Sequence, residues 1–322
     1  GGKEFTEARQ FNLMFKTAIG STDESSSVAY LRPEIAQAMF VNFKNVLDTM
    51  RKRLPFGIAS IGKAFRNEIT PGNFIFRTLE FDLMEFEYFI KEAEWEKHFE
   101  YWLKEQKDWL KELGFAEDHI RTREHEADER SHYSKRTADI EYNTPFGWKE
   151  MLGLAYRGDY DLKKHMEKSG QSLEYTDPDS GEKFVPHVIE PTFGLTRLLL
   201  MILLESYREE ADRVYLKLDP KLAPYKAAVF PLLKNKPELL EKAKEIYSSL
   251  TASHLPLGPI AWDDRGNVGK RYYSQDEIGT PFCITVDFET LENDTVTVRN
   301  RDTKEQPRVR IEDLTKYIME KL

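Results

Sequence analysis

The sequence predicts two domains: an α+β domain of strands, charged helices and irregular loops, followed by a smaller α/β domain. Two stretches of alternating apolar and polar residues, 56–65 and 75–89, flank a Pro–Gly turn, a pattern typical of an antiparallel hairpin. From Tyr225 onward, short apolar runs alternate with helical patterns, which indicates a mostly parallel sheet. A polar, acidic segment separates the two regions. The predicted domains are therefore 1–212 and 213–322.

The elements of the first domain follow from the residue pattern. The stretch 56–65 predicts the first strand of the hairpin, 69–73 its turn, and 75–89 its long second strand. Residues 94–113 place apolar and charged side chains at helical spacing, which predicts an amphipathic helix with one buried face. A second, apolar helix begins near Arg197.

The second domain reads as a series of short strands and helices. The apolar run 227–233 predicts a buried parallel strand, and apolar residues at helical spacing predict a helix over 236–250, with Pro237 near its start. The remaining predicted elements are a strand over 256–264, a helix over 267–277, strands over 282–288 and 294–298, and a terminal helix over 312–322.

Composition excludes several classes of protein. The chain has 322 residues, 32% charged and 40% hydrophobic, with a net charge of −9, which excludes collagen, a coiled coil and a disordered tail. The longest apolar run, 195–204, is interrupted by Thr196 and Arg197, so no membrane span is predicted. The single Cys283 excludes an internal disulfide and suits a reducing cytoplasm. The acidic balance disfavours indiscriminate nucleic-acid binding but leaves room for a local basic patch.

The predicted hairpin carries residues suited to a nucleotide. Residues separated by an even number share a face of a strand, so Arg77, Phe81 and Glu85 point the same way on the second strand. Arg66 and Glu68 share a face of the partner strand. Guanidiniums match phosphate oxygens, an aromatic ring stacks on a base, and a carboxylate accepts from an exocyclic amine. A surface strand with alternating charge pairs explains the same spacing, and spacing alone leaves both interpretations open.

Two other features have simpler interpretations. His125 and His132 lie among glutamates, which is compatible with a metal site, but their spacing is not that of an i, i+4 pair, so a charged, solvated helix is the preferred interpretation. Cys283 lies in an apolar stretch and is predicted to be inert packing.

Longer motifs point to a known family. FRNEITPGNFIFR, with the EF that follows, is similar to class II motif 2, and VIEPTFGLTR is similar to motif 3. GGKEFTEARQFNLMFKT, AYLRPE and FVNFKNV extend the similarity toward the start of the chain, and GTPF, ITVDF and DTVTVRNRDT extend it through the second domain. Together they resemble the homodimeric, bacterial-type glycyl-tRNA synthetases, which are class II aminoacyl-tRNA synthetases. The family's motif 1 region, which would precede these motifs, is not in the sequence, and exposed apolar surface is expected where it would pack.

The resemblance implies a fold and a reaction. It implies a catalytic domain with an antiparallel sheet flanked by helices, followed by a small α/β anticodon-binding domain. Glycine and ATP would form glycyl-adenylate with Mg²⁺, and glycine would pass to the 3′ end of tRNA(Gly). A homodimer in the full-length protein and a cytoplasmic location are also implied.

The family's ATP site is carried over residue by residue. The resemblance implies that Arg66 contacts the α-phosphate, Glu68 the adenine amino group, and Phe81 the adenine ring, with Glu150 as a candidate Mg²⁺ ligand. Arg66, Arg77 and Arg197 would be the catalytic residues. The implied ATP-binding set is Arg66, Asn67, Glu68, Phe76, Arg77, Thr78, Leu79, Glu80, Phe81, Glu150, Met151, Gly194, Leu195, Thr196 and Arg197.

The glycine site is implied in the same way. Glu34, Glu85 and Glu190 would surround the substrate ammonium, Arg157 would approach the carboxylate, and Thr192 would lie beside it. Because glycine has no side chain to bind, selectivity is expected from a crowded pocket that excludes a methyl group. The implied set is Glu34, Phe81, Asp82, Leu83, Met84, Glu85, Arg157, Glu190, Pro191, Thr192, Phe193 and Gly194.

Basic residues of the second domain are the expected tRNA contacts. Collectively they fit phosphate binding, which would weaken steeply with salt. They are Lys270, Arg271, Arg299, Arg301, Arg308 and Arg310.

The sequence departs from the family pattern at several positions, and two alternative functions stay open. A non-catalytic tRNA-binding or regulatory protein with the same fold is one alternative, and an ATP-dependent ligase acting on another amine acceptor is the other. The departures, which affect kinetics and affinity more than reaction type, are Ile35, Ala38, Leu79, Tyr156, Thr192 and Thr196.

Overall fold

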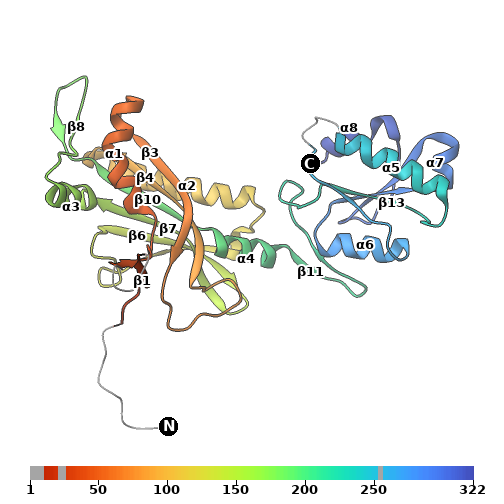
Figure 1. Cartoon of the computed structure of the whole chain (residues 1–322), viewed down its shortest axis with the longest axis horizontal. Helices are drawn as coiled ribbons and strands as arrows, with labels where there is room; N and C mark the ends of the chain where they lie inside the picture. Colours follow the sequence, from red (N-terminus) through yellow and green to blue (C-terminus); the bar gives the residue numbers. More distant parts are fainter. Residues whose placement is uncertain (1–10, 21–26, 253–256) are drawn as a thin grey trace, which may run out of the picture. The chain divides into compact units, whose positions relative to one another are not determined.

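The computed structural model describes residues 11–20, 27–252 and 257–322, which fall in two compact units, 1–201 and 202–322 (Figure 1). The domain boundary predicted after residue 212 stays a prediction. Within the described residues, no helix combines the length and apolar character needed to cross a bilayer.

A six-stranded sheet forms the centre of the first unit. Its strand order is β3-β4-β10-β7-β6-β5, and every neighbouring pair is antiparallel. The antiparallel sheet expected from the resemblance is therefore confirmed. The strands are β3 (Phe56–Phe65), β4 (Glu80–Ile90), β5 (Ile120–Glu124), β6 (Arg136–Thr144), β7 (Gly147–Gly158) and β10 (His187–Gly194).

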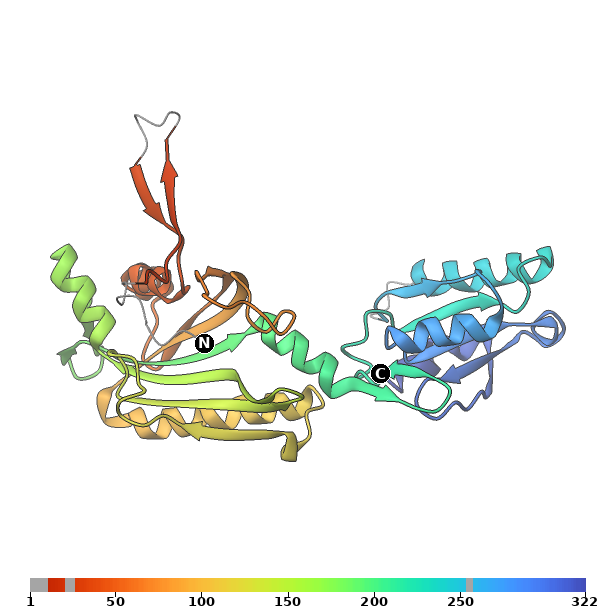
Figure 2. The same ribbon diagram turned by 90° about the horizontal axis from the view of Figure 1, so that it is seen from below.

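Helices cover both faces of this sheet (Figure 2). Alternation along β4 decides which residues meet which helix: Phe86 packs on Trp102 of α2, whereas Phe89 packs on Phe40 and Phe43 of α1. The odd-numbered residues of β4 therefore point to the α1 face. The helices are α1 (Ala36–Met50), α2 (Trp95–Glu112, predicted as 94–113), α3 (Tyr160–Ser169) and α4 (Leu195–Ser206), with 3₁₀ turns η2 (Glu92–Glu94) and η3 (Glu117–His119).

The hairpin prediction is correct for its first strand and wrong for the start of its second. Strand β3 has the predicted bounds, but β4 begins at Glu80, and residues 72–79 form a loop instead. A turn over 73–76, closed by the Phe76 backbone N–H donating to the Asn73 carbonyl oxygen at 3.0 Å, takes the place of the predicted start of the strand. Arg77 is therefore outside β4, so the argument that it shares a strand face with later residues does not hold.

A two-stranded hairpin projects from the first unit (Figure 2). Strands β1 (Lys16–Ile19) and β2 (Ser27–Tyr30) pair with each other in a separate sheet. Ile19 is 63% exposed and Val28 is 58% exposed, so apolar surface lies open to solvent here. A second small pair consists of β8 (Tyr175–Thr176) and β9 (Lys183–Phe184).

The second unit contains a mixed five-stranded sheet with the order β14-β13-β15-β16-β17. β13 is parallel to β14 and β15, whereas the other two pairs are antiparallel, so the prediction of a mostly parallel sheet is only half right. The short connection 287–294 is the reason, because a parallel crossover needs about a dozen residues or more. The strands are β13 (Ala227–Pro231), β14 (Ile260–Trp262), β15 (Phe282–Val286), β16 (Thr295–Asn300) and β17 (Arg308–Arg310), with a β11 (Tyr207–Glu209) and β12 (Val214–Leu216) hairpin ahead of them.

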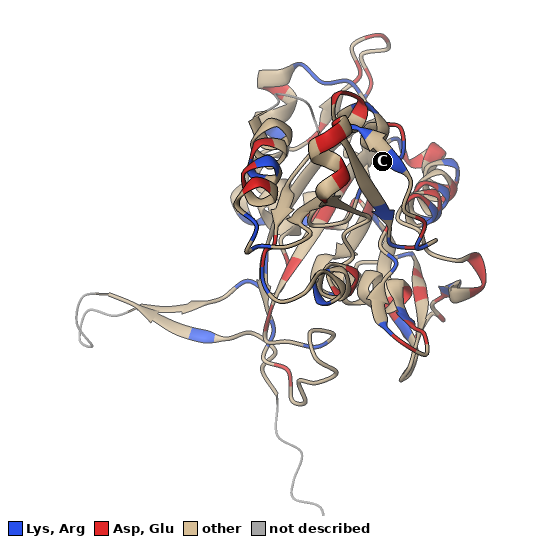
Figure 3. Ribbon diagram, turned by 90° about the vertical axis from the view of Figure 1, so that its right-hand side faces the viewer, with Lys and Arg blue, Asp and Glu red and all other residues tan. Residues whose placement is uncertain are grey.

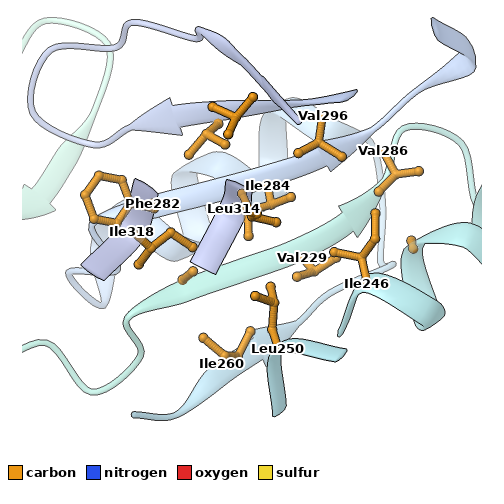
Figure 4. Packing of buried hydrophobic residues seen from close by; sticks show 14 of the residues in the cluster. Val229, Ile246, Leu250, Ile260, Phe282, Ile284, Val286, Val296, Leu314 and Ile318 are labelled. Atoms are coloured by element: carbon orange, nitrogen blue, oxygen red, sulfur yellow. The ribbon is translucent and has the colours of Figure 1, made fainter. Parts of the chain in front are cut away.

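Alternation along β15 divides the core of this unit. Ile284 and its even-numbered neighbours pack with Ile246 of α5 and Leu314 of α8 (Figure 4). Cys283 points the other way and packs buried with Phe230 on the α6 side, which confirms it as core packing. The helices are α5 (Pro237–Ala252), α6 (Val268–Glu277), α7 (Phe288–Asn293) and α8 (Leu314–Met319), with the 3₁₀ turn η4 (Ile311–Asp313).

Candidate active site

A hollow opens on the first unit where β4, β7, β10 and the start of α4 meet the 75–78 loop. Its wall combines arginines, carboxylates and aromatic rings. The lining residues are Arg66, Glu68, Ile75, Phe76, Arg77, Thr78, Phe81, Asp82, Leu83, Glu150, Met151, Gly153, Thr192, Gly194, Thr196 and Arg197.

Most of the predicted ATP-binding residues line this one hollow. Arg66, Phe81 and Arg197, on which the nucleotide interpretation depends, come from three separate parts of the chain and face the same space. Ile75 and Gly153 also line it and were not predicted. The predicted ATP-binding residues that do not line it are Asn67, Leu79, Glu80 and Leu195, and the predicted glycine-binding residues that do not are Glu34, Met84, Glu85, Arg157, Glu190, Pro191 and Phe193.

Arg66 and Phe81 form a stacked pair at the hairpin end of the hollow. The guanidinium carbon of Arg66 lies 5.3 Å from the centre of the Phe81 ring, and its Nε donates to the carbonyl oxygen of Pro33 at 3.1 Å. The Arg66 backbone N–H donates to Leu79, which extends the hairpin by one bond beyond β3. A flat cationic group over an aromatic face suits a purine base and its phosphates.

Arg197 occupies the first turn of α4. Its Nε donates to the Phe76 carbonyl oxygen at 3.2 Å, its Nη1 donates to Glu150 Oε2 at 2.9 Å, and its guanidinium lies 4.6 Å from the Phe76 ring. Thr196 Oγ1 accepts from the Asp82 backbone N–H at 3.0 Å, which ties the helix start to β4. The side-chain charge and the positive end of the helix therefore add together at one wall of the hollow.

Two residues of one cross-sheet row, Thr192 and Gly153, line the floor of the hollow. Strand register places Glu85, Thr192, Gly153 and Asp139 directly opposite one another on β4, β10, β7 and β6. Directly paired residues point to the same face, which here is the α1 face. A Cβ at Gly153 would stand 3.8 Å from Thr192 Cβ and 4.0 Å from Asp139 Oδ1, so the missing side chain contributes to the depth of the floor.

Glu150 fits the role of a Mg²⁺ ligand. Glu150 Oε2 accepts from Arg197. A Cβ added at Gly153 would lie 4.0 Å from Glu150 Oε1 and 4.0 Å from Asp139 Oδ1. Burial and the nearby Glu150 raise the pKa of Asp139. Mg²⁺ in nucleotide sites is bound by one or two carboxylates together with substrate phosphates, and the Glu150 and Asp139 carboxylates both lie near Gly153 here.

The His125 and His132 alternative receives no support from the geometry. The His125 ring hydrogen-bonds Asp139 at 2.6 Å, whereas His132 packs edge-on to Tyr133 and Tyr160. The predicted helix is wrong at this point, because β5 precedes His125 and turns follow it. Over the described ranges, the His, Cys and acidic side chains near enough to surround a small cation are a different set, Glu85, Glu87 and Glu190.

Those three buried carboxyls lie beside the floor of the hollow. One oxygen from each falls within 4.8 Å of the others. Ile35 donates its backbone N–H to Glu85 Oε2 at 3.2 Å, and burial, Glu190 and Glu34 together raise the pKa of Glu85 to about 8. Two of the three, Glu85 and Glu190, were predicted. Glu87 was missed, although its position two residues after Glu85 places it on the same strand face.

Arg157 lies inside this acidic group. Its Nε and Nη2 donate to Asp161 at 2.7 and 2.8 Å, its Nη1 donates to Glu190 at 2.8 Å, and its guanidinium lies 3.8 Å from the Tyr133 ring. The role of Arg157 toward a substrate carboxylate stays a prediction, since three of its donors already bind protein carboxylates. Asp161 was also missed, and its i, i+4 spacing from Arg157 is the available signal.

Comparison with known proteins identifies the family. Residues 15–207 match the family described as the tRNA synthetase class II core domain (G, H, P, S and T), and residues 226–321 match the anticodon binding domain. Glycine–tRNA ligases of Caldanaerobacter subterraneus subsp. tengcongensis and Geobacillus kaustophilus are each 53% identical to the chain. They cover all of it, and it covers 69% and 70% of their respective lengths. The chain belongs to the glycine–tRNA ligase family.

Family membership confirms the fold class and the enzyme class predicted from the sequence. A class II synthetase core followed by an anticodon-binding domain is the predicted order, and an aminoacyl-tRNA ligase is the predicted enzyme. The glycine–tRNA ligase of Alkaliphilus oremlandii is 52% identical over the same whole chain. The non-catalytic alternative has no comparable support.

Two of the positions at which the sequence departs from the family motifs, Ile35 and Tyr156, are buried, whereas Ala38 and Leu79 are exposed. Ile35 is 2% exposed and joins a small apolar cluster with Ala64, Leu83 and Phe81. Tyr156 stacks on Trp95 with ring centres 4.5 Å apart, and its hydroxyl meets His187 Nδ1 at 2.5 Å. Ile35 therefore packs beside Phe81 and Leu83 of the hollow, whereas Tyr156 packs against α2.

Half of the predicted tRNA-contacting residues are buried, which corrects that prediction. Arg271, Arg299 and Arg301 are 2%, 6% and 1% exposed, and their guanidiniums bind Asp276 or backbone carbonyls inside the second unit. Alternation in a strand and a helix does not distinguish a buried, fully hydrogen-bonded arginine from an exposed one. Basic and acidic segments are interspersed on the ribbon (Figure 3). The exposed candidates that remain are Lys270, Arg308 and Arg310.

Proposed function

We propose that the chain activates glycine with ATP to glycyl-adenylate and transfers glycine to the 3′ end of tRNA(Gly). Arg66, Phe81 and Arg197 line one hollow, and a buried acidic group lies beside its floor. This observation carries the proposal. Arginines with an aromatic ring fit a nucleoside triphosphate, and clustered carboxylates fit the ammonium of a small amino acid.

The chemistry needs no nucleophile from the protein. An oxygen of the glycine carboxylate attacks the α-phosphorus, the bond to the β-phosphate oxygen breaks, and pyrophosphate leaves. A hydroxyl of the terminal tRNA ribose then attacks the glycyl carbonyl carbon, and AMP leaves. Arg66 stabilises charge on the α-phosphate, Glu68 accepts from the adenine amine, Phe81 stacks on the ring, and Arg197 holds the distal phosphates.

The nucleotide is proposed to arrive with Mg²⁺. Glu150, with Asp139 as the second carboxylate, would hold the ion between them and the phosphates, where it would neutralise phosphate charge and orient the leaving group. Arg197 keeps Glu150 in place through the 2.9 Å ion pair.

The floor of the hollow is proposed to select glycine by exclusion. Thr192 faces the hollow opposite Gly153, and Glu85 is its register partner on β4. A substrate methyl group would meet the Thr192 side chain and the acids behind it. Pyrophosphate exchange with alanine at a rate comparable to that with glycine would refute this selectivity.

Three further assignments are proposals that extend beyond the active site. The second unit would bind the tRNA anticodon region. The full-length protein would be a homodimer, and the exposed Ile19, Val28 and Ile61 on β1, β2 and the edge strand β3 are the apolar surface available to a partner. The cytoplasmic location predicted from the single Cys283 stays a prediction. The mass in solution tests the dimer.

Glycine-dependent ATP–pyrophosphate exchange tests the proposed function directly. We expect exchange with the unmodified chain and at least a thousandfold loss in the Arg66→Ala variant, since a phosphate-binding charge contributes several kcal/mol to such a transition state. Arg53→Ala is the matched control, because Arg53 is an exposed arginine paired with Asp179 away from the hollow. Full exchange by Arg66→Ala would remove the basis of the assignment.

A further inference from the structure

Glu87 is the most deeply buried acid of the first unit's site. Its exposed fraction is 0%, and neither of its carboxyl oxygens finds a hydrogen-bond partner among the described residues. It lies on the α1 face of β4 with Glu85, and Glu190 approaches from the neighbouring strand β10. An ionised carboxylate without a donor is too costly to bury, so Glu87 must either be protonated or face a cationic ligand.

The groups that face Glu87 come from every element packed around it. β4 contributes Glu85, β10 contributes Glu190, β7 contributes Arg157, α3 contributes Asp161, and the segment before α1 contributes Glu34. Tyr133 lies against Arg157, and Gln37 donates to both Glu34 and Asp161, with His165 hydrogen-bonded to Gln37. Five carboxyls thus surround a single guanidinium.

The Arg157 guanidinium already donates hydrogen bonds to two carboxylates of the protein. Asp161 accepts two of the Arg157 hydrogen bonds, and Glu190 accepts a third. Among the described residues, no cation contacts Glu34, Glu85 or Glu87. Burial and mutual repulsion raise the pKa of Glu85 to about 8 and the pKa of Glu87 well above its ordinary range. At pH 7 Glu85 therefore carries a proton in the ligand-free site, and burial without a donor favours the neutral form of Glu87.

We propose that the substrate ammonium exchanges with a proton in this cluster: Glu85 ionises as the amino group binds, while Glu87 stays protonated beside it as a positioning residue. The proposal rests on the proposed function and deepens it. One positive charge enters as one leaves, so the charge of the buried cluster stays constant. The proton passes to the solvent, and no covalent bond changes.

The exchange predicts how glycine affinity depends on pH. Below pH 8 the free site must lose a proton before it can hold the ammonium, so affinity rises with pH. Loss of one proton gives close to a tenfold fall in Kd per pH unit by linkage, from about pH 6 to about pH 8, and a plateau above. The substrate ammonium itself stays charged across this range.

Calorimetry measures the exchange. Glycine is titrated into the full chain with Mg²⁺ and an ATP analogue that has a methylene group between the α- and β-phosphorus, which prevents adenylate formation. Measurements at pH 7 in two buffers of different ionisation enthalpy give the number of protons released. We expect close to one proton per glycine. A binding heat that is the same in both buffers, with a Kd constant from pH 6 to 8, would overturn the exchange while leaving the proposed function intact. Absence of glycine binding at any pH would instead contradict the proposed function.

Variants separate the two residues. Glu85→Gln has no proton to release, so we expect release to vanish and Kd to rise at least about tenfold. Glu87→Ala opens space beside Glu85 and so reduces the desolvation of its carboxyl group, so the pH midpoint falls and proton release at pH 7 decreases. Glu87→Gln, the neutral isostere, should restore the midpoint that Glu87→Ala loses. If Glu87→Gln instead shifts the midpoint as far as Glu87→Ala does, Glu87 acts as a carboxylate and the assignment is wrong. Thermal unfolding of each variant checks that it is folded.

Discussion

The two units bury charge in opposite ways. In the second unit, Asp276 is 0% exposed and accepts from Arg213 and Arg299 at 2.8 Å, while Arg301 donates to the carbonyls of Gly279 and Leu218. Here each guanidinium has a carboxylate, since Glu210 also accepts from Arg213 and Asp302 accepts from Arg301, and carbonyl oxygens take the remaining donors. In the first unit the acids outnumber the cation, and Glu87 has no partner within the described part of the chain.

This difference distinguishes a structural network from a binding site. A buried network in which donors and acceptors match holds the fold and has nothing left for a ligand. Buried acids that outnumber the cations beside them are stable only when they are protonated or when a cation is bound. Such a cluster therefore favours a cationic ligand. Both clusters contain buried charged residues, and only the hydrogen-bond partners of each one separate the two roles.

The largest expected effect is on the stability of the second unit. Asp276→Ala leaves Arg299 buried without a carboxylate and removes one of the two carboxylates that Arg213 contacts, which costs about 3–5 kcal/mol of the free energy of unfolding. Denaturant unfolding monitored by the fluorescence of Trp262, which lies in this unit, measures it. Asp276→Asn serves as the isosteric control and should lose less. Equal stability of both variants and the unmodified chain would contradict the view of this cluster as structural.

Removing an acid from the first unit should raise the free energy of unfolding, the opposite of the effect expected for Asp276→Ala. The pKa of Glu85 is higher in the folded chain, about 8, than when unfolded, so the folded state binds the extra proton between about pH 4.5 and 8. Stability from this group is full below pH 4.5 and is lost as pH rises toward 8. Glu85→Gln removes the loss, and we expect it to be about 2–4 kcal/mol more stable than the unmodified chain at pH 8.

Unfolding curves at pH 5 and pH 8 test that sign. The difference between Glu85→Gln and the unmodified chain should be larger at pH 8 than at pH 5. Glu174→Gln, at an exposed glutamate near β8, is the matched control and should show no such difference. A Glu85→Gln variant that is less stable at pH 8 would mean that its carboxylate is paired after all.

How far the sequence predicts these regions depends on the kind of contact. Strand β3 was predicted to the residue because a period of two marks a half-buried strand. The start of β4 was placed five residues too early, since the residue pattern does not signal the turn that Phe76 closes onto Asn73. The mixed sheet of the second unit was missed although the short connection before β16 was visible in the sequence.

The site shows the same limit. Motifs located Arg66, Phe81 and Arg197, which do line one hollow, because residue type and local spacing carry that chemistry. Glu87, Asp161 and Gly153 were missed, because their importance arises from partners on other strands and helices. The buried Arg299 was misassigned to the surface, because its bond to Asp276 joins residues 23 apart in the chain. Motif spacing predicts chemistry, whereas matching of buried charges needs the fold.

A smaller effect is expected at the floor of the hollow. Gly153→Ala adds a methyl group in ordinary contact with Thr192, Asp139 and Glu150, at 3.8–4.0 Å, so the fold should tolerate it. The methyl group occupies space where substrate atoms would lie, and we expect glycine KM in pyrophosphate exchange to rise about 10- to 100-fold, equivalent to about 1–3 kcal/mol. Gly72→Ala, at a loop glycine with no atom within 4 Å of the added Cβ, is the control. Unchanged KM would show that the substrate does not reach the floor.

The smallest expected effect on stability is at the surface of the second unit. Arg310 pairs with Glu312 at 3.1 Å, and both side chains are about 70% exposed, so Arg310→Ala should change the free energy of unfolding by less than about 0.5 kcal/mol. If Arg310 contacts a tRNA phosphate, the same variant should lower the slope of log binding constant against log salt by about 0.7 to 0.9. Arg299→Ala provides the contrast, because its charge is buried against Asp276: stability should fall and folded protein should keep the full salt slope. A salt slope unchanged by Arg310→Ala would place the tRNA contacts elsewhere. A large loss of stability in Arg310→Ala would contradict the view that the exposed charges of this unit add little to its stability and the buried ones add much.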